Sequence, residues 1–226
     1  MEIRVSEGPG VKVVASIVSL LALFLTMGVR PASAGTILYD NGAYTRVIGP
    51  PGINGGYSTT DSFVLSTAAN VTSVTLFVWE HSDPAYNGSA VTSVGWSITS
   101  SAFGGATYAS GTATPTDAWA AWAYGPAGHD NLRSETFSIP SLPLGAGTYW
   151  LQIQNGVAGS DVLTWDSIGG ASQAYTESPS ANIMPWDSEA FQVLGDPTGT
   201  PEPGSFGLLA AGVLGMAALL RRRTAR

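Results

Sequence analysis

The sequence predicts an all-β domain, an antiparallel β-sandwich of the jelly-roll type, placed between two targeting segments. Hydrophobic residues recur at every second position in several short stretches, and Gly-, Pro-, Asn- and Asp-rich breaks separate these stretches. A long apolar run lies near each end of the chain. We therefore divide the chain into a signal peptide (1–34), a β-sandwich domain (35–195), a linker (196–204), a transmembrane helix (205–220) and an Arg-rich tail (221–226).

Alternating hydrophobicity marks the predicted strands. In VTSVTLFVW, Val74, Leu76 and Val78 fall on one face, while Phe77 and Trp79 fall on the other. The same spacing aligns the apolar residues of VGWSI, ETFSI, GTYWLQIQN and EAFQVL, namely Val94, Trp96 and Ile98, Phe137 and Ile139, Tyr149, Leu151 and Ile153, and Phe191 and Val193. The breaks GPPGINGG, HSDPAYNGS, GPAGHDN and PLGAGT are predicted loops or turns.

Charge and cysteine content exclude several classes of function. Between Asp40 and Asp196 the chain has thirteen acidic residues and two arginines, a formal charge of −11. Such a surface repels phosphate backbones, so nucleic acid is an unsuitable partner. Cysteine is absent, which removes disulfides, thiol nucleophiles and thiolate metal sites. The domain must therefore be stabilised by burial of apolar area.

The N-terminal segment has the pattern of a secretory signal peptide. Arg4 and Lys12 precede an uncharged apolar run over residues 13–29, and Ala32-Ser33-Ala34 fits the small-residue cleavage rule. The alternative is an uncleaved membrane anchor, because the run is long for such a peptide. We expect cleavage.

The C-terminal apolar run covers Ser205–Leu220, sixteen residues. As a helix it would span roughly 24 Å at 1.5 Å per residue, somewhat less than a bilayer core. The alternative is a buried helix of the domain. The run has no polar face and is followed by Arg221, Arg222 and Arg223, which the positive-inside rule places in the cytoplasm. We expect a membrane span.

The order of these C-terminal parts resembles a known family. Pro201-Glu202-Pro203, an apolar helix and a terminal arginine cluster are similar to the PEP-CTERM sorting signal of exported bacterial proteins. The resemblance implies recognition by the membrane enzyme exosortase, anchoring through the C-terminal helix, and a cell-surface or extracellular location after processing. The two prolines favour an extended segment that presents Glu202 to such an enzyme.

The central part also resembles extracellular β-sandwich domains that precede PEP-CTERM tails. The stretches that carry this resemblance are LYDNG, SVGWSI, ASGTA, LGAGTYWLQIQN, WDS and SEAFQVLG. The family has no settled molecular activity. The resemblance therefore implies fold and location more than function.

The sequence predicts no catalytic residue. His81 and His129 fall in predicted loops, and no G-x-S-x-G motif orients a serine. Carboxylate pairs that could serve a glycoside hydrolase are present, as in any acidic protein, at Glu80 and Asp83, Asp161 and Asp166, and Asp187 and Glu189. We keep a hydrolase only as a third alternative.

We expect no cofactor, with a structural calcium left open. Asp40, Asn41 and Asp166 offer the hard oxygen ligands that calcium prefers, but no D-x-D-x-D-G loop is present. The alternative is a solvated acidic surface.

Aromatic residues give the sharpest binding hypothesis. In DAWAAWAYG, Trp119, Trp122 and Tyr124 lie close together with alanine spacers. Exposed rings stack on sugar faces while neighbouring polar groups bind hydroxyls. The competing interpretation places these rings in the sandwich core, the usual location of tryptophan.

Two functions of different classes follow. The first is an exported, non-catalytic surface or matrix protein in an exopolysaccharide-rich envelope, and the second is a carbohydrate-binding module. An exposed row of rings would favour the second, whereas uniformly buried rings would favour the first.

Overall fold

The computed structural model describes residues 35–45, 51–81, 90–125 and 128–198, without the side chains of residues 123–129. The predicted signal peptide, the PEP segment, the transmembrane helix and the arginine tail lie outside this part. Among the described residues, no helix is long and apolar enough to cross a membrane. The described part consists of antiparallel strands and turns, which confirms the all-β class.

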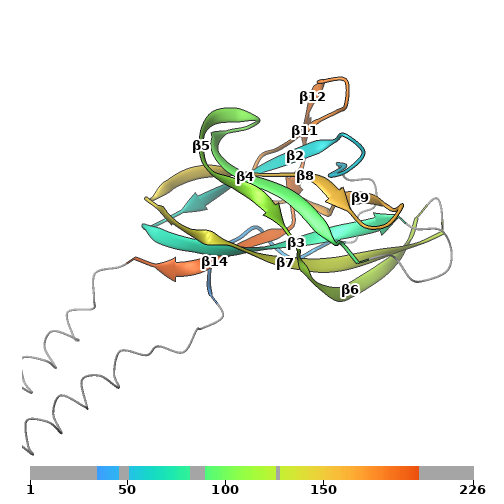
Figure 1. The fold of residues 1–226 in the computed structure, drawn as a ribbon, viewed down its shortest axis with the longest axis horizontal. Helices are drawn as coiled ribbons and strands as arrows, with labels where there is room; N and C mark the ends of the chain where they lie inside the picture. The colour runs from blue at the N-terminus through green and yellow to red at the C-terminus, as the bar shows by residue number, and fades with distance from the viewer. Residues whose placement is uncertain (1–34, 46–50, 82–89, 126–127, 199–226) are drawn as a thin grey trace, which may run out of the picture. The chain divides into compact units, whose positions relative to one another are not determined.

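Two large antiparallel sheets form the domain (Figure 1). The first sheet has the order β1-β14-β3-β7-β6. Strand β9 pairs with the C-terminal end of β3, beyond the part that pairs with β14. Its strands are β1 (Thr36–Asp40), β14 (Phe191–Pro197), β3 (Ala69–His81), β7 (Gly128–Leu144), β6 (Thr116–Gly125) and β9 (Val162–Trp165).

The second sheet has the order β12-β11-β2-β8-β4-β5. Its strands are β12 (Ile183–Trp186), β11 (Ala174–Glu177), β2 (Ser58–Leu65), β8 (Gly147–Val157), β4 (Ser93–Ser101) and β5 (Gly104–Ala113). A short ladder joins β10 (Ser167–Ile168) to β13 (Ser188–Glu189). The chain crosses repeatedly between the sheets, so strands far apart in sequence pair with one another.

The predicted strands are present, as β3, β4, β7, β8 and β14. Two predicted loops need correction. His81 is the last residue of β3 rather than a loop residue, and GPAGHDN ends inside β7, which begins at Gly128 and includes His129. These polar residues extend the strands because β3 and β7 continue to pair as far as Glu80 and Asn131. Strand β14 also continues two residues past Gly195, to Pro197.

Aromatic rings fill the space between the two sheets. The Phe191 ring contacts Phe63, Tyr39 and Trp165, with ring centroids 6.5, 5.6 and 5.4 Å away. Leu151 and Ile153 of β8 complete this layer and are fully buried. Such pairs add about 0.5–1.5 kcal/mol each beyond the area they bury. The rings therefore supply the cohesion that a cysteine-free domain requires.

A smaller cluster covers the outer face of the first sheet. Trp79 packs there with Ala121 and Leu132, against the half-buried Tyr44. The Trp79 indole Nε1–H donates to Asp166 Oδ1 over 2.6 Å. Because Tyr44 lies on the segment after β1, this cluster ties that segment to the sheet.

Candidate functional site

Trp119 and Trp122 project from the same face of the edge strand β6. Trp119 pairs with Arg133 and Trp122 pairs with Asn131, two residues apart on β7. A register shift between Trp119 and Ala121 inserts one extra residue into β6. Partners two residues apart point to the same side of a sheet, so this bulge turns a three-residue spacing into a shared face.

Both rings are exposed. Trp119 has 59% and Trp122 has 47% of its surface accessible, whereas Trp79, Trp96 and Trp165 are buried. An exposed ring on a sheet presents a flat apolar surface held in place by the backbone. Sugars bind such surfaces through their C–H faces. The core interpretation of these two residues is therefore wrong.

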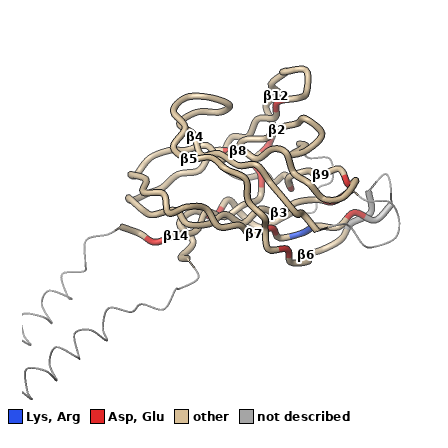
Figure 2. The backbone as a smooth tube through the Cα atoms, viewed as in Figure 1, with Lys and Arg blue, Asp and Glu red and all other residues tan. Residues whose placement is uncertain are grey.

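A charged row runs across the same face, from Asp117 on β6 through Arg133 on β7 to Glu80 on β3. Arg133 donates from Nε to Glu80 Oε2 over 3.0 Å and from a terminal guanidinium nitrogen to Asp117 Oδ2 over 2.7 Å. Glu80 is completely buried, while Arg133 and Asp117 keep part of their surface exposed. Within the described residues, Arg133 is the only Lys or Arg, which Figure 2 shows as the blue segment between acidic neighbours.

Burial makes two of the carboxyl groups weak acids. Burial raises the pKa of Glu80 to about 7, although the charge of Arg133 opposes the shift. Burial, with the nearby charge of Asp117, raises the pKa of Glu135 to about 8. At neutral pH Glu135 is thus mostly protonated and able to donate a hydrogen bond. Glu80 and Glu135 together therefore carry less negative charge at neutral pH than two ordinary glutamates would.

The third predicted residue of this site is Tyr124. Its backbone continues β6 and pairs with His129, but its side chain lies outside the described part. Sequence patterns did not identify Glu80, Glu135 or Arg133 as neighbours of the rings. These residues come from β3 and β7, and only the pairing of these strands with β6 brings them together.

His81 is not the solvated loop histidine that the sequence predicted. Its Nε2 lies 2.7 Å from Thr164 Oγ1, and its Nδ1 lies 3.3 Å from Asp130 Oδ2. This order resembles a catalytic triad, but the Asp130 carboxylate makes no hydrogen bond within the described part, and Thr164 is buried. A triad requires a carboxylate hydrogen-bonded to the histidine that it orients.

The three residues proposed for calcium lie in different hydrogen-bond groups. Asp40 is exposed, and Asp166 accepts from Trp79 and from the Thr45 backbone. The Asn41 amide nitrogen lies within 3.1 Å of four oxygens, those of Asp61, Ser172, Ser188 and the Glu189 carbonyl. The described residues contain no group of three or more His, Cys, Asp or Glu side chains suited to a metal ion.

The Glu189 side chain lies beside this network and is fully buried. Burial, followed by the charge of Asp61, raises its pKa well above the ordinary value. Both of its carboxyl oxygens lack a hydrogen-bond partner within the described part. The expectation of no cofactor, with a structural calcium left open, stays a prediction.

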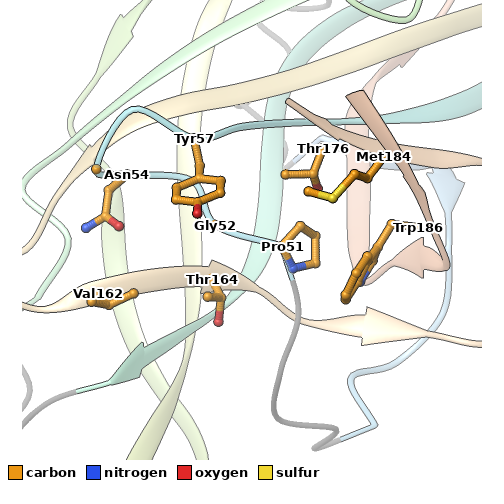
Figure 3. A pocket seen from close by; sticks show the side chains of 10 residues that line it. Pro51, Gly52, Asn54, Tyr57, Val162, Thr164, Thr176, Met184 and Trp186 are labelled. Carbon is orange, nitrogen blue, oxygen red and sulfur yellow. The ribbon is translucent and has the colours of Figure 1, made fainter. Parts of the chain in front are cut away.

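A groove with a volume of about 410 Å³ lies elsewhere on the domain (Figure 3). Its walls come from the Pro51–Tyr57 segment, β9 and the β11–β12 hairpin. Figure 3 shows the rings of Tyr57 and Trp186 on opposite sides of the view, with Pro51 near the middle and Met184 next to Trp186. Sequence patterns did not indicate this groove, because three separate segments form it.

Comparison with known proteins identifies the C-terminal segment. Residues 200–223 match the PEP-CTERM protein-sorting motif, which confirms the sorting signal predicted from Pro201, Glu202, Pro203 and the arginines Arg221, Arg222 and Arg223. The motif implies export, membrane anchoring before processing, and processing by exosortase, a membrane enzyme. It supports sorting to the cell surface.

A comparison with curated proteins gives no match. A solved structure described as "AvmM Catalyzes Macrocyclization in Alchivemycin A Biosynthesis" aligns with 71% of this chain and 92% of its own length, at 12% identity and a TM-score of 0.24.

Proposed function

We propose that this protein is a non-catalytic cell-surface protein that binds exopolysaccharide through the face of β6 formed by Trp119 and Trp122. The observation that carries the proposal is the bulge in β6, which places two exposed rings on one face. Two exposed tryptophans on an edge strand are costly for an exported domain unless a ligand covers them.

The arrangement of the two rings suits a chain of sugars. Positions whose partners lie two residues apart are separated by about 6.6–6.8 Å along a strand. Neighbouring rings at this spacing can contact successive parts of one polysaccharide. The partly exposed Arg133, which pairs with Trp119 across the ladder, lies beside them and provides a donor for hydroxyl groups.

The hydrogen-bonding state of the acidic residues favours binding over hydrolysis. Glycoside hydrolases use two carboxyl groups that face the scissile bond across an open cleft. Here Glu80 is buried and bound to Arg133, and Glu135 is also buried. Of the pairs that the sequence offered, Asp166 is held by Trp79 and Thr45, Glu189 is buried, and Asp83 lies outside the described residues.

The sorting motif supports this function through location. A domain processed at the outer face of the membrane meets the polysaccharides of the envelope first. Exopolysaccharide is therefore the ligand class that we assign. After processing, the domain would either link the polysaccharide matrix to the cell surface or remain within that matrix.

The experiment measures co-sedimentation of the exported protein with insoluble exopolysaccharide from its own host, for wild type and for Trp119→Ala and Trp122→Ala. Each substitution is expected to reduce retention because loss of a stacked ring removes about 0.5–1.5 kcal/mol. Tyr108→Ala is the control, since Tyr108 is also an exposed ring but lies on β5 of the other sheet. Equal retention of all variants, with unchanged melting temperatures, would leave only the structural surface role.

A further inference from the structure

The groove between Tyr57 and Trp186 has the composition of a ligand site. Tyr57 is 40% exposed and Trp186 is 37% exposed, and Met184, which also lines the groove, is 42% exposed. The Tyr57 hydroxyl and the Trp186 indole N–H have no hydrogen-bond partner in the described part of the chain. Two apolar ring faces thus stand beside two polar groups that a ligand can bind.

The groove carries no charge. Its lining residues are Pro51, Gly52, Asn54, Gly55, Tyr57, Val162, Thr164, Thr176, Met184 and Trp186, none of which is acidic or basic. The surrounding domain is strongly acidic. A uronic acid or phosphate ligand would find no cation here and would be repelled by the domain as a whole, so charge complementarity favours an uncharged ligand.

The polar groups in the floor are already bonded to the protein. The Asn54 amide donates to the Asp161 carbonyl and accepts from the Leu163 N–H. Thr176 Oγ1 lies 3.2 Å from Thr59 Oγ1. The hydroxyls of a ligand are therefore met chiefly by the tyrosine and tryptophan at the rim, which is typical of a site that holds a ring between aromatic faces.

The walls of the groove are fixed before any ligand arrives. Gly52 pairs with Thr164 of β9, and its carbonyl accepts from Thr59 Oγ1. A Cβ at position 52 would lie 3.1 Å from Tyr57 Cγ, so glycine allows the tyrosine to rest against the backbone. On the opposite wall, Met184 and Trp186 pair with Thr176 and Ala174 of β11. Such preorganisation lowers the entropic cost of binding.

We propose that this groove is a second carbohydrate site, which holds a neutral sugar residue between Tyr57 and Trp186. Its volume of about 410 Å³ lies at the small end of the range for ligand pockets and suits one or two sugar residues. The groove uses none of the residues of the β6 face, so it does not depend on the function proposed above. A domain with both sites would bind two segments of polysaccharide and would gain avidity when they belong to one chain.

The experiment follows Trp186 directly in the full chain, labelled with 5-fluorotryptophan and held in a detergent without a sugar head group. The Trp186→Phe variant identifies the Trp186 fluorine resonance. The probes are neutral hexasaccharides, namely cellohexaose, laminarihexaose, maltohexaose and mannohexaose, with oligogalacturonate as the charged comparison and decanoate as an aliphatic one.

At least one neutral probe is expected to shift the Trp186 resonance. Tyr57→Ala should weaken that binding roughly two- to twelvefold through loss of a stacked ring. Tyr57→Phe keeps the ring and should weaken it less, which separates ligand contact from loss of the fold. Trp119→Ala should leave the Trp186 shift unchanged, so this site can fail or succeed independently of the β6 face. A Trp186 resonance that responds to none of the neutral probes, or only to decanoate or oligogalacturonate, overturns the proposal.

Discussion

Trp119 and Trp122 lie on one face of β6 although three positions separate them in the chain, because the strand carries one extra residue at the Trp119–Ala121 register shift. In a regular strand an odd spacing would place the two rings on opposite faces. The bulge is therefore the feature that creates the proposed binding face.

The first prediction concerns a deletion. Removing Ala120 should be tolerated, because Trp119, Ala121 and Trp122 can then pair with Arg133, Leu132 and Asn131 in a regular ladder. Both rings keep their face, so polysaccharide binding should survive with a modest fall in melting temperature.

Deletion of Ala118 is the matched control. It removes the same residue type from the same strand but moves Asp117 to the opposite face, away from Arg133. This variant should be less stable than the Ala120 deletion. If the Ala120 deletion is the more damaging of the two, the assigned register is incorrect.

The second prediction is that Arg133→Leu strongly destabilises the domain. The substitution leaves Glu80 buried without its cation, and removal of one partner of a buried pair costs about 3–5 kcal/mol. Combining it with Glu80→Gln should recover part of the loss, because the side chain at position 80 then carries no charge. Chemical denaturation measures both effects, and a double variant no more stable than Arg133→Leu alone would argue against the pair.

The third prediction concerns pH. The pKa of Glu135 rises from 4.5 to about 8 on folding, mainly through burial. The stabilising effect of protonated Glu135 is therefore complete below pH 4.5 and is lost as the pH rises from 4.5 to about 8. Above that pH it does not change further. The melting temperature of the wild type should fall between pH 5 and pH 8.

Glu135→Gln tests this assignment because the amide mimics the protonated acid and cannot ionise. The variant should melt close to wild type at pH 5 and higher than wild type at pH 8. Parallel pH profiles for the two proteins would show that Glu135 does not titrate between these pH values.

The fourth prediction concerns the sorting motif. Pro201→Ala together with Pro203→Ala should leave membrane association intact but prevent processing, because alanine permits a helix where proline favours an extended segment. Replacing Arg221, Arg222 and Arg223 with glutamate should instead disturb retention of the C-terminus in the cytoplasm, because arginines oppose translocation. Mass and membrane partition of the exported protein distinguish the two. Normal trimming of the proline variant would contradict processing at this motif.

Local sequence patterns were sufficient to predict the strands in which every second side chain enters the core. Val74, Leu76 and Val78 alternate along β3 and are all buried, as the two-residue period requires. The same rule could not predict His81, because a polar residue at a strand end looks like the start of a loop. Its place in β3 depends on pairing with Val162 of β9, which lies far away in the sequence.

The candidate sites were harder to predict for the same reason. Trp119 and Trp122 were recognised from composition, but their exposure depends on the position of β6 at the edge of the sheet. Two features bring together segments that no local sequence pattern connects. They are the ion pair of Arg133 with Glu80 and the groove lined by Tyr57 and Trp186. Both are consequences of strand order.

The most direct test of polysaccharide binding at β6 is hydroxyl-radical footprinting of the full chain, with and without exopolysaccharide from its host. Trp119 and Trp122 should be oxidised rapidly in the free protein because both rings are exposed, and polysaccharide should protect both. Tyr108, which is exposed on β5, should be oxidised at the same rate in both samples. If the protein binds the polysaccharide while Trp119 and Trp122 are oxidised as fast as in the free protein, the β6 face is not the binding site.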